Sequence, residues 1–184
     1  MKIRHLAAAT LVIAALQGCW SPSDTELVKN GTMQFNKTLS VGEAFDRWGE
    51  CQHKNWQEFK SDNGQRVVQF TCSSRDVTAF MNKAKSILTN ESKYNHFDLT
   101  EVLSQFQWTI NKDDSFQLHH VAVTWKWADG KSREVDSTAN MLDTVYRNES
   151  TFNMSALRDQ NSLDAARTAR TYANMAYMLY DSAR

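Results

Sequence analysis

A turn signal between two β-forming stretches constrains the fold more than any other feature of the sequence. Asn63-Gly64 lies between residues 55–60 and 65–72, both of which contain aromatic or β-branched side chains. Asn-Gly in this setting favours a two-residue type I′ turn, because both central residues of that turn need positive φ. Such a turn places Trp56 opposite Thr71. The sequence therefore predicts an antiparallel hairpin in the first half of the chain.

Further strands are predicted downstream. Apolar and polar residues alternate over 101–110, whereas the apolar residues of 116–127 change parity midway. A β-bulge near His119-His120 would bring these residues onto one face. Ala128-Asp129-Gly130 is another turn signal, and residues 131–136 are expected to form a short charged strand of the kind found at sheet edges.

Apolar residues at helical spacing predict helices on either side of these strands. Ser40 and Glu43 have the form of a capping box in front of a short helix. Residues 77–88 carry the clearest amphipathic pattern, and the chain is expected to be helical from about residue 137. We therefore predict a single α+β domain over residues 26–184, in which an antiparallel sheet of hairpins packs against amphipathic helices.

An export signal precedes the predicted domain. Lys2 and Arg4 stand before an apolar run, residues 6–16, which is shorter than the roughly 20 residues needed to span a bilayer. The run ends in Leu16-Gln17-Gly18-Cys19. This ending resembles the lipobox of bacterial lipoproteins. The alternative is an ordinary secretory signal in which the cysteine occurs by chance.

The lipobox resemblance implies a location. Cys19 would be lipidated and would become the first residue of the mature chain, so residues 1–18 are expected to be a signal peptide. Residues 19–25 would hold the lipid anchor and a flexible tether. In lipoproteins an aspartate after the cysteine favours retention in the inner membrane, and this chain has Trp20 there. The outer membrane is therefore expected, with the domain facing the periplasm.

The two other cysteines are expected to form a disulfide. An even number of cysteines in an oxidising compartment favours a structural bridge, and Cys51 and Cys72 would close a loop of about 20 residues. A redox or metal-binding pair is the alternative, but the chain has no C-x-x-C spacing.

Charge argues against some partners. Removal of Lys2 and Arg4 with the signal peptide lowers the 21 basic residues to 19, against 21 acidic residues, so the mature charge is about −2. Nucleic acid and anionic lipid surfaces are bound through clustered positive charge. We therefore expect neither as the main partner.

A second resemblance covers much of the predicted domain. The segment from Leu39 to Cys72 contains VGEAFD, Trp56, Phe59 and VVQF, and NKDDSFQL follows at residues 111–118 before an Asp-Gly turn. This pattern resembles a segment of small, mostly uncharacterised bacterial surface or periplasmic proteins. The resemblance covers about residues 39–136 and implies an envelope location and this kind of fold, without an activity.

The sequence contains no recognisable catalytic or cofactor motif. G-x-S-x-G, H-E-x-x-H, P-loop and dinucleotide-binding patterns are absent. His119 and His120 would face opposite sides of a strand unless a bulge intervenes, so they do not suggest a metal site. Asp113-Asp114 lacks the remaining EF-hand positions and is expected to be a turn. We predict no catalytic residue, no metal and no cofactor.

Tryptophan is the most suggestive residue type. Trp108, Trp125 and Trp127 are predicted on adjacent strands, where aromatic residues on one face pair across the sheet. They could form an exposed surface for sugar rings or for a partner's apolar side chains. The alternative is that they belong to the core under the helices.

Three functions follow from these observations. The favoured one is a non-catalytic outer-membrane lipoprotein that binds another envelope protein, as an assembly factor, inhibitor or immunity-type module. The second is a glycan or peptidoglycan binder that uses the three tryptophans. The third is a hydrolase in which His53, His96 or His119 meets a carboxylate in a cleft. The expected partners are thus the membrane, through the lipid, and an envelope protein or peptidoglycan.

Overall fold

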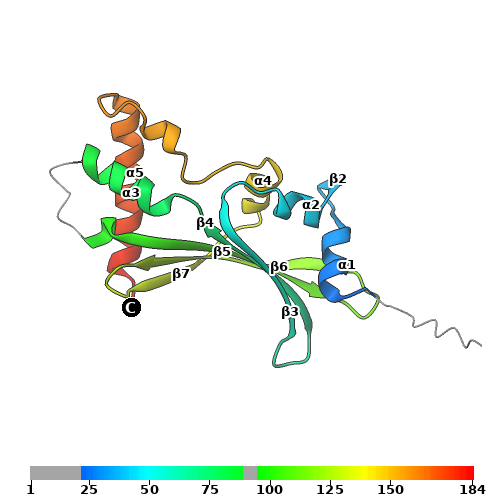
Figure 1. The fold of residues 1–184 in the computed structure, drawn as a ribbon. Helices are drawn as coiled ribbons and strands as arrows, with labels where there is room; N and C mark the ends of the chain where they lie inside the picture. The colour runs from blue at the N-terminus through cyan, green and yellow to red at the C-terminus, as the bar shows by residue number, and fades with distance from the viewer. Residues whose placement is uncertain (1–21, 89–94) are drawn as a thin grey trace, which may run out of the picture.

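The computed structural model describes residues 22–88 and 95–184. The predicted signal peptide and Cys19 lie outside the described residues, as does residue 20. The chain forms the α+β fold that the sequence predicts, with an antiparallel five-stranded sheet, a smaller two-stranded sheet and helices packed on them (Figure 1).

The five-stranded sheet is an antiparallel meander. Its strands lie in sequence order, β3-β4-β5-β6-β7, and each pairs with its neighbours along the chain. Hairpin loops join the strands except between β4 and β5, where the connection contains α3. The elements of this part are β3 (Cys51–Lys60), β4 (Arg66–Ser74), α3 (Val77–Ile87), η2 (Asn95–Phe97), β5 (Leu99–Ile110), β6 (Phe116–Trp127) and β7 (Ser132–Asp136). The short charged strand predicted at 131–136 is therefore confirmed as the edge strand β7.

Helices precede and follow the meander. The N-terminal part contains α1 (Asp24–Asn30), β1 (Thr32–Met33), β2 (Asn36–Ser40) and α2 (Val41–Asp46), and the C-terminal part contains α4 (Met141–Tyr146), η3 (Met154–Leu157) and α5 (Leu163–Asp181). The capping box predicted in front of α2 is present, because Ser40 accepts from the N–H of Glu43 and Glu43 accepts from the N–H of Ser40.

The predicted tether extends too far into the chain. Residues 24 and 25 belong to α1, so the folded domain begins before residue 26. The Ser23 hydroxyl accepts from the N–H of Glu26 at 3.1 Å, and the Glu26 carboxylate accepts from the N–H of Ser23 at 3.2 Å. This capping box starts α1, a helix that the sequence analysis did not predict.

The β3–β4 hairpin is present, but its register differs from the prediction. Trp56 lies opposite Phe70, one residue earlier than expected. The loop between Ser61 and Gln65 has three residues. The N–H of Ser61 donates to the carbonyl of Gln65 at 3.0 Å. Gly64 has a φ of 80°, and it is the loop residue with positive φ. A type I turn followed by a left-handed residue therefore replaces the two-residue type I′ turn.

The same turn closes the other two hairpins of the sheet. The N–H of Asn111 donates to the carbonyl of Ser115 at 2.8 Å, and that of Trp127 donates to the carbonyl of Lys131 at 3.0 Å. The left-handed position is filled by Asp114 (φ 61°) in the first loop and by Gly130 (φ 87°) in the second. One turn type thus sets the register of all three hairpins.

Bulges in the five-stranded sheet adjust which side chains face the core. The bulge predicted near His119-His120 is confirmed, since Gln107 pairs with His120 while the next residue of β5 pairs with Leu118. Two further bulges, at Gln52 and at Thr100, were not predicted. The bulge at Gln52 turns Cys51 onto the same side of the sheet as Cys72, with Cα atoms 5.2 Å apart, and the predicted disulfide joins them.

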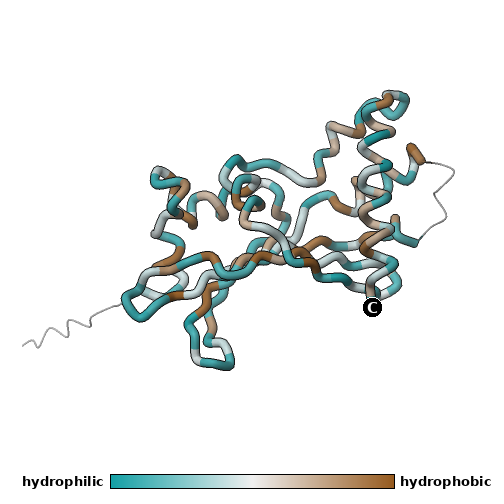
Figure 2. The backbone as a smooth tube through the Cα atoms, turned by 180° about the vertical axis from the view of Figure 1, so that it is seen from behind, coloured by the Kyte–Doolittle hydropathy of each residue, from teal (hydrophilic) through white to brown (hydrophobic). Residues whose placement is uncertain are grey.

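The α-helices of the described residues pack on one side of the sheet, in two groups. Figure 1 shows α1, α2 and α4 over one end and α3 and α5 over the other. Each group covers its own apolar cluster. The α2 cluster includes Phe45, Trp48, Phe70, Phe106 and Trp108, and the α5 cluster includes Phe80, Phe97, Trp125, Trp127 and Ala173. In Figure 2 the apolar segments follow the strands and the helix faces above them, and the tip of the projecting hairpin is hydrophilic.

The edges of the sheet differ. Strand β3 is long, and most of its residues are exposed. Strand β7 is short, and the N–H and C=O of Arg184 bond to those of Ser132 at its start. The sheet therefore has one long open edge and one short edge that the end of the chain partly covers.

We predict that Gly64→Ala destabilises the protein by about 1 kcal/mol, because an L-residue in the left-handed region carries a conformational cost. A Cβ at this position would meet no atom within 4 Å, so the cost comes from the backbone alone. Urea denaturation measures the change. Asp62→Ala, in the same exposed loop but at negative φ, is the control and should leave the midpoint unchanged.

Candidate functional site

The side of the sheet opposite the helices carries polar side chains, and we call it the open face. Its central feature is a row in which Gln57, Gln69, Gln107 and His120 lie opposite one another on β3, β4, β5 and β6. The Nε2 of Gln107 donates to the Oε1 of Gln69 at 2.7 Å. The row places amide and imidazole groups across four strands, and we call it the amide row. Gln57 is exposed and Gln107 and His120 are half-buried, whereas Gln69 is buried between its neighbours.

A hollow of about 620 Å³ adjoins the amide row at the hairpin end of the sheet. Gln107, Gln117 and His119 contribute polar groups to its lining, and Phe59 contributes an aromatic ring that is 39 % exposed. Phe59 comes from the open edge strand β3, so apolar surface and hydrogen-bonding groups lie side by side. This combination suits the side chains of another polypeptide.

A second hollow, of about 580 Å³, lies at the other end of β3 and β4. It brings His53 near Ser73 and Glu101, and a histidine, a serine and a carboxylate are the residue types of a hydrolase triad. The Ser73 hydroxyl donates to Glu101 at 3.2 Å, and Lys126 pairs with the same carboxylate at 2.9 Å. His53 makes no hydrogen bond to either residue, so the nucleophile–base contact of a hydrolase is missing in this arrangement.

The histidines named by the hydrolase hypothesis do not converge. His53 and His119 line different hollows of the open face. His96 is buried near α5, with its ring 5.5 Å from that of Tyr177. Among the described residues, no group of three histidine, cysteine, aspartate or glutamate side chains is placed to hold a metal ion.

The three tryptophans do not form a binding surface. Trp108 is fully buried, and Trp125 and Trp127 are at most 6 % exposed. They also belong to different clusters, because Trp108 packs with Phe45 whereas the other two lie under α5. The alternative that placed them in the core is correct. The strand parity that set them on one face was right, but that face is the one the helices cover.

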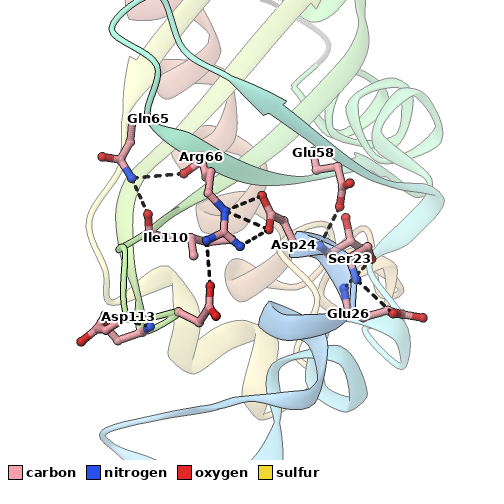
Figure 3. Close-up of polar contacts among 11 residues, drawn as sticks. Ser23, Asp24, Glu26, Glu58, Gln65, Arg66, Ile110 and Asp113 are labelled. Atoms are coloured by element: carbon pink, nitrogen blue, oxygen red, sulfur yellow. Dashed lines mark hydrogen bonds and ion pairs between the residues drawn. The ribbon is translucent and has the colours of Figure 1, made fainter. Parts of the chain in front are cut away.

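A charged contact fixes the N-terminal end of the domain beside the hairpin tips. The Arg66 guanidinium, at the start of β4, bonds both oxygens of Asp24 and also Asp114 in the β5–β6 turn (Figure 3). Its Nη2 makes a further contact with Asp24. Hydrogen bonding to Arg66 lowers the pKa of Asp24, and the same two carboxylates raise the pKa of Arg66. We call this contact the Arg66 clamp.

The turn reading of Asp113-Asp114 is confirmed. Asp113 accepts from the N–H of Ser115 at 3.1 Å and from its hydroxyl at 2.7 Å. These bonds lower the pKa of Asp113. Asp114 occupies the left-handed position and pairs with Arg66 at 2.7 Å. Asp113 thus stabilises the loop, and Asp114 belongs to the Arg66 clamp.

The open face escaped sequence reasoning, although its signal is present. Gln105, Gln107 and Gln117 alternate with apolar residues, and so does Gln69 within β4. The alternating apolar residues of these strands predicted the core face. The polar residues between them mark the face that no described helix covers. The register was also needed to align four residues from different strands.

Comparison with known proteins adds no relative. No family model matches the chain, and neither a curated protein nor a solved structure is significantly similar to it. Across residues 22–88 and 95–184, no helix combines the length and apolarity that crossing a bilayer requires.

We predict that Asp24→Asn lowers stability at neutral pH and has no effect in strong acid. The pKa of Asp24 is lower in the folded state than its ordinary 3.8, so the carboxylate stabilises the fold above that pH. This contribution disappears as the pH falls through the folded-state pKa. Urea midpoints of both proteins between pH 2 and 7 measure it. Asp62→Asn, in the exposed hairpin loop, is the control, and a constant difference at all pH values would contradict the prediction.

Proposed function

We propose that the protein is a lipoprotein of the bacterial cell envelope, anchored through Cys19 in the outer membrane, whose domain binds another envelope protein without catalysis. The open face is the binding surface in this proposal. The observation that carries it is the amide row beside the exposed ring of Phe59, on the one side of the sheet where no described helix packs.

The size of the open face suits such a partner. The five strands contain 10, 9, 12, 12 and 5 residues. At about 4.8 Å between strands and about 3.3 Å per residue, they cover on the order of 800 Å². A stable protein interface buries about that area on each partner. Phe59 supplies an aromatic anchor, and the surrounding amides supply the polar contacts that accompany such anchors.

The Arg66 clamp would orient this face relative to the membrane. Ser23 is four positions after Cys19 in the chain, so their Cα atoms can be at most about 14 Å apart. Because α1 begins beside the hairpin tips, those tips would lie close to the bilayer surface. The strands would then lead away from it, and the open face would stand across the membrane surface, accessible from the side.

The glycan alternative loses its original basis, because the tryptophans that would stack on sugar rings are buried. The amide row could still form hydrogen bonds with a polysaccharide. Phe59, however, is an edge residue with its ring partly covered, and it offers no broad stacking platform. We therefore propose a protein partner, and the experiments below separate the two.

We predict that a photo-crosslinker in place of Phe59 captures one envelope protein in stoichiometric amounts in living cells. The same crosslinker in place of Leu163, which is 77 % exposed on the helix side, is the matched control and should capture none. Gln107→Ala should weaken the Phe59 crosslink severalfold. Equal crosslinking from both positions, or capture of peptidoglycan alone, would contradict a protein-binding open face.

We predict that Cys19→Ser abolishes acyl labelling of the protein and moves it from the membrane fraction to the soluble fraction. Trp20→Asp should keep the label but shift the protein to the inner membrane. Metabolic labelling with an alkynyl fatty acid and sucrose-gradient fractionation measure both results. Unchanged labelling of the serine variant would show that the anchor lies elsewhere or does not exist.

A further inference from the structure

A cavity of about 320 Å³ lies on the helix side of the sheet, where the two helix groups part. Met141 of α4 borders it on one side, and Met175 and Leu179 of α5 border it on the other. Strands β5, β6 and β7 and the end of β4 form its floor. It is therefore separate from the open face, and nothing proposed for that face depends on it.

The walls of the cavity are apolar, and its floor contains the hydroxyl groups of two serines. Val102, Val123, Trp125 and Phe152 contribute hydrocarbon surface. Ser74 and Ser104 line the same space and are 4 % and 2 % exposed. Neither hydroxyl has a hydrogen-bond partner among the described residues.

These serines lie at the boundary between the two apolar clusters. Along the covered face of β5, Ser104 stands between Val102 of the α5 cluster and Phe106 of the α2 cluster. A larger apolar residue here would have joined the clusters. The two hydroxyl groups face the space and are not satisfied by other side chains, so they are available to a bound molecule. The site therefore offers one molecule both hydrocarbon contact and hydrogen bonds.

The part of the cavity wall next to residues 148–151, between α4 and η3, is held in place by hydrogen bonds. The indole N–H of Trp48 donates to the carbonyl of Glu149 at 2.8 Å, and the N–H of Gly49 donates to Asn148 at 2.6 Å. The buried carboxylate of Glu50 accepts from the N–H of Thr151 at 2.9 Å. These bonds fix the segment that leads into Phe152, so the cavity is preformed, as ligand sites commonly are.

The charges around the cavity restrict the ligand. Asp136 borders the opening with its side chain 89 % exposed, and no basic side chain of the described chain lines the space. A carboxylate or phosphate would therefore meet an acidic opening and no cation. In size, the cavity is about twice the roughly 150 Å³ that holds benzene, which corresponds to about ten carbon atoms.

We propose that this cavity is a binding site for a small uncharged amphiphile, with a hydrocarbon body of about ten carbons and one hydrogen-bonding group that reaches Ser74 and Ser104. The apolar walls hold the body, and the two serine hydroxyls select for the polar group. Trp125 lies in the wall, so a bound molecule changes the surroundings of its indole ring.

Isothermal titration of the full-length protein with three probes tests the proposal. We expect 2-naphthol to bind with a Kd below about 1 mM, naphthalene to bind about fivefold more weakly and 2-naphthoate not to bind. Weaker binding of 2-naphthol than of naphthalene would overturn the role of the serines. Absence of binding by all three probes would mean that the cavity holds only water and would overturn the site.

Variants assign the binding to this cavity. Ser104→Ala keeps the space and should reduce 2-naphthol binding about fivefold, to the level of naphthalene, without changing naphthalene binding. Ser132→Ala, on the exposed edge strand, is the control. Val135→Phe fills the space from the half-buried edge and should abolish binding of both. Thermal unfolding checks that each variant is folded, and binding unaffected by Val135→Phe would place the probes elsewhere.

Discussion

The packing of one ring, Phe45, holds the N-terminal half of the structure together. This side chain of α2 meets Phe70, Phe106 and Trp108 at centroid distances of 4.9, 4.9 and 5.1 Å, each edge to face. Those three rings come from two adjacent strands, so a single residue connects the short helix to the centre of the sheet. Such contacts contribute beyond the area they bury, because the ring edge and ring face carry opposite partial charges. The disulfide ties the segment that follows α2 to the same sheet.

The position of α2 determines how the sheet can be covered. Six residues of helix with α1 and α4 beside it cover one end of the sheet, and the long helix α5 with α3 covers the other. The two groups include the α-helices of residues 22–88 and 95–184, so none of these helices covers the opposite side of the sheet. The same division leaves the space at Ser74 and Ser104. The open face and the cavity therefore have one structural origin, although their chemistry differs.

Local chemistry in the sequence was sufficient to predict most of the strands and the fold class. Asn63-Gly64 predicted a hairpin, and the change in the alternation of apolar residues before Val121 predicted a bulge. Ser40 and Glu43 predicted the start of a helix. The register of the first hairpin was wrong because Asn-Gly also fits a three-residue loop, in which only the glycine is left-handed. Which face of the sheet is covered depends on tertiary packing, and for this reason the sequence alone left the location of Trp108 open.

The unequal edges of the sheet limit how copies of this domain can associate. A filament built by strand addition needs two available edges on every subunit, so that each copy can both accept and offer a strand. Here only β3 is long and open, while β7 is short, charged and partly occupied by Arg184. Two copies that met through β3 would have no second long edge left for a third. Strand pairing between molecules would therefore end at a dimer and could not grow into fibres.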